Sequence, residues 1–467
     1  MAWLTSASLL GRTAAFLSLI VVARHVTPAE FGIFRMVADL VIVMELFRDI
    51  GMARALQTYS GDRKMACDVT FHISNAAGLV MFALALIFAG DVARFYNTPE
   101  VESLLRVMAI TIVLNTLTVV PRVIMQLERR WDQLAISEFA PQLLGAIVLV
   151  VGAINGYAYW SYAASVLIRC GGTMALAYWI NGWRPRKQFS WPVARELFAF
   201  GKWAYLDLLL YAGVITFADS IYLGRFQGAH ELGLYGQANN LVQVTFQVVV
   251  LPLDRIAIVM VADANRENKA YAHLVQITYY VALLMAPLYA FLMLFPELII
   301  GVVLSERWIG AAPILQVLAL NWFFVGVFTT PLRNYFLGTV RPKLLAYSIT
   351  PSIIFIFVMY WLSGGSYNGV QIAWLFLASR LIHIALSLFF MKADKEPLWP
   401  LFARLWKPLL CVGVAAPSAW YLSKFAAQEF VSLLIATVVF FGLYGAFWTK
   451  PILAIVKRRR QSVPSDS

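Results

Sequence analysis

Long apolar runs separated by short polar breaks repeat along almost the whole chain. A helix needs roughly 20 apolar residues to cross the hydrocarbon of a bilayer, and these runs reach that length. We therefore predict an all-α integral membrane fold with about fourteen transmembrane helices. The expected spans are 5–24, 32–54, 70–92, 104–127, 136–155, 159–180, 198–224, 232–256, 273–295, 311–337, 344–363, 370–391, 405–424 and 430–449.

The composition agrees with lipid as the solvent of this chain. Hydrophobic residues make up 61% of it and charged residues only 13%, about half the charged fraction of a typical soluble domain. The net charge of +12 could suggest nucleic-acid binding, but the basic residues lie in short clusters between apolar runs, and no domain collects them. We therefore expect no nucleic-acid partner.

The sequence also carries little that is typical of an enzyme. Its three cysteines are widely spaced, and no pair has the spacing of metal ligands, so all three are expected to be free thiols, with Cys67 in a polar loop. No phosphate-binding glycine loop and no hydrolase or transferase constellation is present. We therefore predict no catalytic residues, no metal site and no cofactor.

The distribution of Lys and Arg predicts the orientation in the membrane. Alternate breaks are basic, among them Arg63–Lys64, Arg129–Arg130 and Arg184–Lys187, whereas the intervening breaks such as Asn155–Tyr159 are poor in Lys and Arg. Basic loops stay on the cytoplasmic side. The pattern predicts a multi-pass protein of a bacterial or archaeal cytoplasmic membrane with both termini in the cytoplasm.

The chain contains an internal duplication. Residues 20–41 align without a gap with residues 221–242, and later blocks align in the same order. The matched pairs are Arg24 with Arg225, Glu30 with Glu231, Gly32 with Gly233, Phe34 with Tyr235, Pro121 with Pro331, Pro141 with Pro351, and Trp160 with Trp374. We predict two pseudo-symmetric six-helix halves around a central cavity, at 1–181 and 198–392. A cytoplasmic linker at 182–197, two additional helices at 393–450 and a basic cytoplasmic tail at 451–467 complete the chain.

Parallel repeats of this kind favour a transporter. Matching blocks are separated by an even number of spans, so the two halves have the same orientation and an axis along the membrane normal relates them. In such folds the substrate path lies between the halves, and alternating access moves one half against the other.

The matched blocks resemble a known family. Ala23-Arg24 followed by Thr27–Gly32 is similar to the first-loop signature of Wzx-like oligosaccharide flippases, which belong to the multidrug/oligosaccharidyl-lipid/polysaccharide exporter superfamily. Phe47–Gly51 resembles the next block of that family, and Trp308 with Ala311–Pro313 resembles the segment before its tenth helix. The resemblance covers nearly the whole chain.

The resemblance implies a function. Such proteins move an undecaprenyl-diphosphate-linked oligosaccharide from the cytoplasmic to the periplasmic leaflet for O-antigen or exopolysaccharide biosynthesis. The implied partners are that lipid-linked substrate, membrane lipids and the polysaccharide polymerase machinery. A multidrug or other small-molecule exporter of the same superfamily is an alternative, although twelve helices are usual there. A membrane glycan polymerase or ligase is another, although such enzymes typically need a larger periplasmic loop.

Ionisable and amide side chains within apolar spans are costly, so they are candidate functional groups. For the diphosphate and sugar of such a substrate, the cavity candidates are Arg48, Arg54, Arg169, Lys202, Asn239, Asn240, Gln243, Arg380 and His383. For a coupling ion, the candidates are Asp39 and Asp219.

Each candidate also has a structural interpretation. Arg48 could pair along its helix with Glu45, three residues away. Arg169, which the repeat matches with His383, could contact a headgroup or hydrogen-bond a backbone carbonyl. Lys202 could meet diphosphate or lipid phosphate, and Asp219 could coordinate a cation or pair with Arg225. The amides of the 232–256 span could contact sugar or join a network between helices.

Overall fold

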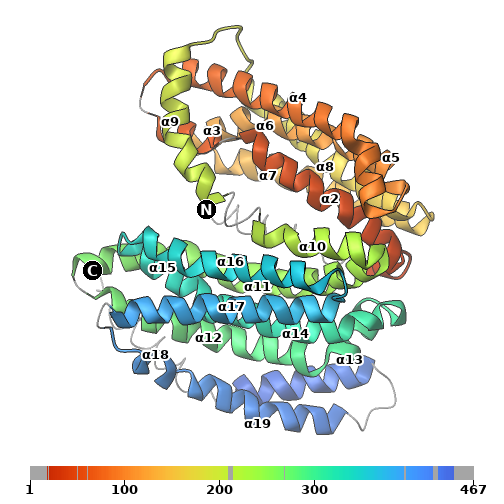
Figure 1. The fold of residues 1–467 in the computed structure, drawn as a ribbon, viewed down its shortest axis with the longest axis vertical. Helices are drawn as coiled ribbons and strands as arrows, with labels where there is room; N and C mark the ends of the chain where they lie inside the picture. Colours follow the sequence, from red (N-terminus) through yellow and green to blue (C-terminus); the bar gives the residue numbers. More distant parts are fainter. Residues whose placement is uncertain are drawn as a thin grey trace, which may run out of the picture. The chain divides into compact units, whose positions relative to one another are not determined.

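The computed structural model describes residues 18, 20–49, 51–59, 61–208, 214–267, 269–393, 396–423 and 430–445. Within these ranges the backbone forms helices and connecting loops and no strand, as Figure 1 shows, which confirms the all-α prediction. Most of the expected first span, 5–24, lies outside the described residues.

The contacts divide the chain into two compact units. The first comprises Met1–Gly236 with Gly365–Asn368, and the second comprises Gln237–Gly364 with Gly369–Ser467. The helices of the first unit are α2 (Pro28–Asp49), α3 (Met52–Thr58), α4 (Arg63–Tyr96), α5 (Glu100–Met108), α6 (Ile110–Leu127), α7 (Trp131–Ile154), α8 (Ala158–Asn181), α9 (Trp191–Leu208) and α10 (Val214–Phe226). The long helix α11 (Gly228–Arg266) begins in the first unit and continues into the second.

The second unit contains the rest of α11 and the later helices. They are α12 (Ala270–Leu294), α13 (Pro296–Val303), the 3₁₀ helix η2 (Glu306–Ala311), α14 (Ala312–Phe324), the π-helix η3 (Val325–Thr329), α15 (Thr330–Gly338), α16 (Pro342–Ser363), α17 (Gly369–Ala393), α18 (Trp399–Ala403), α19 (Trp406–Ser423) and a helix at Phe430–Gly445. Each predicted span from 32–54 onward falls on helices in the described residues.

Eight helical stretches of the described chain are long and apolar enough to cross a membrane. They are Arg63–Tyr96, Glu100–Leu127, Trp131–Ile154, Ala158–Asn181, Ala270–Leu294, Glu306–Gly338, Lys343–Ser363 and Gly369–Ala393. These stretches support a multi-pass membrane protein. The total of about fourteen spans stays a prediction.

Local chemistry accounts for two differences from the predicted spans. The span at 32–54 is two helices, because Gly51 between them has a left-handed backbone with φ 76° that a continuous helix does not allow. The span at 70–92 begins earlier, at Arg63, because the Asp62 side chain caps α4 by accepting hydrogen bonds from the backbone N–H groups of Lys64 and Met65. The prediction of a polar loop around Cys67 was therefore wrong. This thiol is buried where α4 packs with α3, α6 and α9.

The two units use the same pattern of helix packing. In the first, α7 packs against α8, α8 against α6, and α6 against α4; in the second, α16 packs against α17, α17 against α14, and α14 against α12. The aligned prolines Pro141 and Pro351 lie inside the matching helices α7 and α16. Repeated packing between matched helices supports the internal duplication. The proposed boundaries of the six-helix halves stay a prediction.

Two matched glycines meet where α2 and α11 cross inside the first unit. A Cβ atom on Gly32 would overlap the carbonyl oxygen of Ala229, and one on Gly233 would overlap the carbonyl oxygen of Pro28 and lie 3.2 Å from the Gly32 nitrogen. Ala229 aligns with Pro28 in the repeat, so the two contacts are related by the same pseudo-symmetry as the sequence. Only glycine allows the two backbones to approach this closely.

We predict that Gly233→Ala destabilises the protein, because the added methyl group has to push the two helices apart. The expected loss in the free energy of unfolding is about 1–3 kcal/mol. Gly413→Ala is the matched control: Gly413 lies inside α19 with open space around it, so alanine there should be neutral or stabilising by about 0.5–1 kcal/mol. Thermal unfolding of the detergent-purified variants measures both effects. Equal unfolding temperatures for the two variants would contradict the close crossing.

Candidate functional site

Helix α2 is the centre of the first unit. It packs against α4, α5, α6, α8 and α10. Its first turn is closed by a capping box in which Glu30 accepts hydrogen bonds from the backbone N–H and the hydroxyl of Thr27, at 2.7 and 2.9 Å. Five ionisable residues follow along the helix, at positions 35, 39, 45, 48 and 49. The side chains at positions 35, 39, 45 and 48 are partly or fully buried among the surrounding helices.

The first group of charges lies where α2, α10 and α11 meet, and we call it the Asp219 cluster: Arg35, Asp39, Asp219 and Tyr235. The Arg35 Nε donates to Asp39 Oδ2 at 2.6 Å, and the two side chains are 13% and 7% exposed. Asp219 is buried on α10 and accepts hydrogen bonds from the Ser220 backbone N–H, at 2.7 Å, and from the Tyr235 side chain. The Arg35 charge acts on both carboxylates.

This arrangement brings together the two carboxylates that the sequence proposed for a coupling ion, Asp39 and Asp219. One guanidinium faces two carboxylates, so the cluster is short of one positive charge. A proton or a small cation would offset this excess negative charge. The alternative pairing of Asp219 with Arg225 was wrong, because Arg225 Nη1 donates to the Phe95 carbonyl at 2.7 Å and its guanidinium lies over the Phe95 ring.

The second group has the opposite balance, and we call it the Glu45 cluster: Glu45, Arg48, Asn115, Arg169 and Cys170. Asn115 on α6 donates a hydrogen bond from Nδ2 to Glu45 Oε1. The positive charges of Arg48 on α2 and Arg169 on α8 both act on Glu45 and on the thiol of Cys170. Two guanidiniums face one carboxylate, so this cluster has one positive charge in excess.

The Arg48 guanidinium is the least satisfied group of the Glu45 cluster. Its Nε and Nη1 atoms are buried, and no hydrogen-bond partner for either lies in the described part of the chain. Leaving buried donors without acceptors costs about 1–3 kcal/mol each, and more for a charged group. Arg169, by contrast, presents an exposed side chain on α8. The pairing of Glu45 with Arg48 is therefore incomplete, and the cluster keeps donors that an anion could use.

The candidates of the second unit lie on α11 and α17. The buried Asn239 accepts a hydrogen bond from Trp322 Nε1 at 3.1 Å, Asn240 lies 3.4 Å from Gln237 Oε1, and Gln243 is half-buried. His383 is buried on α17 beside Arg380, and its Nδ1 atom has no hydrogen-bond partner among the described residues. The amides of α11 thus follow one helix, and at least Asn239 belongs to a network between helices.

Two candidates lie apart from these groups. Arg54 is exposed on α3, beyond the break at Gly51, so it does not share a helix with Arg48. Lys202 belongs to α9, but its side chain lies outside the described part of the structure. Among the described residues, no group of three or more His, Cys, Asp or Glu side chains could hold a metal ion.

Three residues of the two clusters were missed by the sequence analysis. Arg35 stands four residues before Asp39, which is pairing distance on a helix. Asn115 is a lone amide in an apolar span, and such a group needs a partner. Tyr235 aligns with Phe34 in the repeat, and its hydroxyl is the only polar atom that distinguishes the two side chains. Each signal was present, but nothing in the sequence linked these residues to the carboxylates they contact.

The comparisons with known sequences point to one family. Residues 21–313 match the model of a family described as polysaccharide biosynthesis protein. The succinoglycan biosynthesis transport protein ExoT of Rhizobium meliloti is 25% identical over 313 residues, which are 66% of this chain and 62% of that protein. The teichuronic acid biosynthesis protein TuaB of Bacillus subtilis is 24% identical over 60% of this chain and 58% of its own length. The chain thus spans less than two thirds of these two relatives.

A third relative is matched over a longer region. The lipopolysaccharide biosynthesis protein WzxC of Escherichia coli is 20% identical, and the match covers 79% of this chain and 76% of that protein.

Solved structures show the same fold. The lipid II flippase MurJ in an inward closed conformation has a TM-score of 0.77 at 14% identity, covering 97% of this chain and 100% of that one. An inward-facing multidrug transporter of the MATE family has a TM-score of 0.61 at 16% identity, covering 82% and 95%. The chain therefore has the same helical fold as these two proteins.

The buried ion pair of the Asp219 cluster should contribute strongly to stability. Arg35→Met leaves two carboxylates buried without their cation, so we expect the free energy of unfolding to fall by about 3–5 kcal/mol. The matched control is Arg94→Met, which breaks the Arg94–Asp91 pair whose side chains are 79% and 56% exposed. An exposed pair contributes about 0–1 kcal/mol. Denaturation of the two purified variants compares them, and an equal loss would refute the buried network.

Proposed function

The chain belongs to the family of polysaccharide biosynthesis proteins, and from that premise we propose that it flips a lipid-linked oligosaccharide across the inner membrane. The substrate is an oligosaccharide on undecaprenyl diphosphate. It moves from the cytoplasmic to the periplasmic leaflet by alternating access and supplies O-antigen or exopolysaccharide synthesis. The relatives that carry transport and polysaccharide-biosynthesis names support this proposal.

The observation that carries the proposal is the excess positive charge of the Glu45 cluster. A diphosphate headgroup cannot enter hydrocarbon without groups that replace its water. Arg is well suited to this task, because its planar fork of N–H donors makes paired hydrogen bonds to phosphate oxygens. The buried Nε and Nη1 groups of Arg48 have no acceptor among the described residues, and Arg169 has an exposed side chain close enough for its charge to act on Glu45.

Glu45 and Asn115 would then act as positioning residues. The Asn115 amide fixes one oxygen of the Glu45 carboxylate. That carboxylate holds the two guanidiniums near each other before the substrate arrives, and it limits their mutual repulsion. When the diphosphate binds, its oxygens accept hydrogen bonds from Arg48. Binding therefore removes the free-energy cost of the buried Arg48 donors in the empty site.

The Asp219 cluster is suited to bind the coupling ion that would drive the transport cycle. Asp39 and Asp219 share one guanidinium, so uptake of a proton or a small cation would restore charge balance. The amides of α11 in the second unit, with Arg380 and His383 of α17, would line the path for sugar hydroxyls. Each of these assignments belongs to the proposal, as do the cytoplasmic termini and the polymerase partner.

Leaflet translocation in a flippase-null strain with a compatible glycan pathway tests the proposal. Wild type should restore periplasmic lipid-linked glycan. Arg48→Gln and Arg169→Gln, at matched membrane levels, should lower the initial rate by about ten- to one-hundredfold, the equivalent of one lost charge-assisted hydrogen bond. The matched control is Arg94→Gln, which changes an exposed ion pair and should stay within about twofold of wild type.

Other outcomes would point elsewhere. Failure of the wild type in several glycan backgrounds, despite normal insertion, would refute lipid-linked oligosaccharide flipping, and drug efflux by that strain would then favour the exporter alternative. Glycan elongation by the purified protein would favour a polymerase. Normal rates in both Arg variants would leave flipping intact but reject the Glu45 cluster as the diphosphate site. Lys202→Gln, assayed alongside, tests the remaining cation of the predicted set.

A further inference from the structure

The segment between α8 and α9 is held in a defined conformation on the surface of the first unit. The backbone N–H of Arg186 donates to Asp68 Oδ1 at 3.0 Å, and the Arg186 carbonyl accepts from His72 Nε2 at 2.8 Å. Asp68 and His72 lie one turn apart on α4, and the Asp68 side chain is buried. Both backbone polar groups of one linker residue, Arg186, are therefore fixed by the single helix α4.

Apolar contacts on the inner side of this segment reinforce the attachment. The Trp183 ring meets the edge of Phe71 on α4, with ring centroids 5.5 Å apart, and it also contacts Tyr178 on α8. On α9, Ala194 and Leu197 are buried in the core formed with α3, α4 and α6. We call residues 183–199 the linker ledge. Its inner side is packed, so its outer side has a fixed shape.

The outer side of the linker ledge is basic. Arg184, Arg186, Lys187 and Arg195 are all exposed. The side chains of Arg186, Lys187 and Arg195 have no polar contact in the described part of the chain, whereas Arg184 donates to the carbonyls of Tyr178 and Trp183. The only acidic residue of the ledge, Glu196, accepts a hydrogen bond from the Tyr59 hydroxyl at 3.1 Å. Four cations against one carboxylate make a strongly positive surface.

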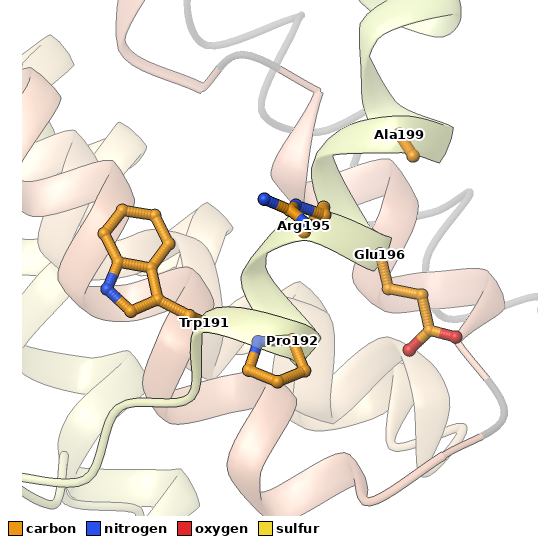
Figure 2. A pocket seen from close by; sticks show the side chains of 5 residues that line it. All are labelled: Trp191, Pro192, Arg195, Glu196 and Ala199. Atoms are coloured by element: carbon orange, nitrogen blue, oxygen red, sulfur yellow. The ribbon is translucent and has the colours of Figure 1, made fainter.

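Large aromatic rings stand beside these cations. Trp179 in the last turn of α8 is 79% exposed and Trp191 at the start of α9 is 77% exposed, while Phe189 packs edge-on against Trp191. Figure 2 shows Trp191, Pro192, Arg195, Glu196 and Ala199, which line a pocket on the first turns of α9. The ledge follows directly on α8, a helix long enough to cross the bilayer, so its residues lie at the height of the lipid headgroups.

We propose that the linker ledge binds the phosphate headgroups of anionic phospholipids. Exposed tryptophans prefer the membrane interface, and the long side chains of Arg and Lys reach lipid phosphate while their apolar stems stay among the acyl chains. Basic residues next to an anionic leaflet each gain attraction to it. Because α4 fixes the ledge, this attraction anchors the first unit in the membrane. The inference does not depend on what the protein transports.

The arrangement favours bulk phospholipid over a lipid diphosphate. The ledge spreads its cations over an exposed surface, which suits several headgroups of one negative charge each. A diphosphate concentrates its charge in one group and is better served by converging donors, such as those of the Glu45 cluster. Lipid diphosphate at the ledge is therefore an alternative that the experiment has to separate.

Lipid titration of the full-length protein in neutral detergent, followed by native mass spectrometry, tests the proposal. The variant is Arg184→Gln with Arg186→Gln and Lys187→Gln. We expect its apparent affinity for phosphatidylglycerol to fall at least tenfold, and the wild-type affinity to weaken as salt is raised. Phosphatidylcholine binding should be equal in both. The matched control is Arg266→Gln with Lys269→Gln and Lys343→Gln, which removes the same charge from exposed positions of the second unit.

The remaining outcomes either support or overturn the proposal. An equal loss in the control variant would mean that net charge alone attracts the lipid, and it would overturn the ledge. Loss of undecaprenyl diphosphate binding with phosphatidylglycerol unchanged would assign the ledge to substrate and also overturn it. Inorganic phosphate at millimolar levels should not displace phosphatidylglycerol, and displacement would indicate a free-anion site instead.

A second variant tests the role of the attachment. Asp68→Ala with His72→Ala keeps every cation of the ledge but removes the two side chains that bond the backbone N–H and carbonyl of Arg186. A partial loss of phosphatidylglycerol affinity, with unchanged binding of phosphatidylcholine, supports a preformed ledge. Full affinity in this variant would overturn the proposal that the fixed conformation matters.

Discussion

The crossing of α2 and α11 constrains the rest of the first unit. At this crossing Gly32 and Gly233 bring two helices from different repeats so close that neither position has room for a Cβ atom. Residues of the next turns of both helices then lie close to the Asp219 cluster. Gly236 lies against the aliphatic stem of Arg35, and Tyr235 reaches Asp219. The crossing therefore places Tyr235 of α11 next to the buried charges that α2 and α10 contribute to the Asp219 cluster.

The absence of water explains how the two charge clusters are built. Inside a membrane, a charged group has to find partners in the protein. Arg35 and Asp39 pair within α2, whereas Glu45 is bonded by Asn115 of the neighbouring helix α6. The matching is incomplete in opposite directions. The Asp219 cluster has one carboxylate more than it has cations, and the Glu45 cluster has one cation more than it has carboxylates. An anionic headgroup and a coupling cation each suit one of them.

The internal repeat shows which features of a duplicated fold persist and which diverge. The packing of α7 on α8 recurs as α16 on α17, and aligned prolines occupy both pairs. The side chains on this shared frame differ. Arg169 is exposed on α8, whereas the aligned His383 is buried on α17. Helix packing is set by many residues together and tolerates change at single positions, so the frame can be kept while each half acquires its own polar groups.

The span formed by α14, η3 and α15 differs locally from the matching helix α6 of the first unit. Pro331 has no backbone N–H, so it cannot satisfy a carbonyl one turn earlier. Just before it, the Thr330 N–H bonds to the Val325 carbonyl, and residues 325–329 form a π-helix. The aligned Pro121 lies inside α6, which has no such widening. Both prolines were evident in the sequence, but the π-helix beside one of them was seen only in the structure.

The sequence by itself determined the membrane fold, the approximate spans and the duplication. The fold and the spans follow from the length of the apolar runs, and the duplication follows from residues that match between the two halves. All of these can be read from the order of residues along the chain. It also singled out Asp39, Asp219, Arg48 and Arg169 as costly residues. The break at Gly51 and the early start of α4 at Asp62 were local signals that the long apolar pattern concealed.

Only the tertiary structure decided which polar residues meet. Asp219 interacts with Arg35 and not with Arg225, and Glu45 interacts with Asn115 and Arg169, which are far away along the chain. The linker ledge likewise depends on Asp68 and His72 of α4, which are separated along the chain from Arg186 by the helices α5 to α8. Apolar periodicity fixes which segments enter the membrane. It carries no information on which faces of those helices pack together. The packing of those faces determines which polar side chains interact.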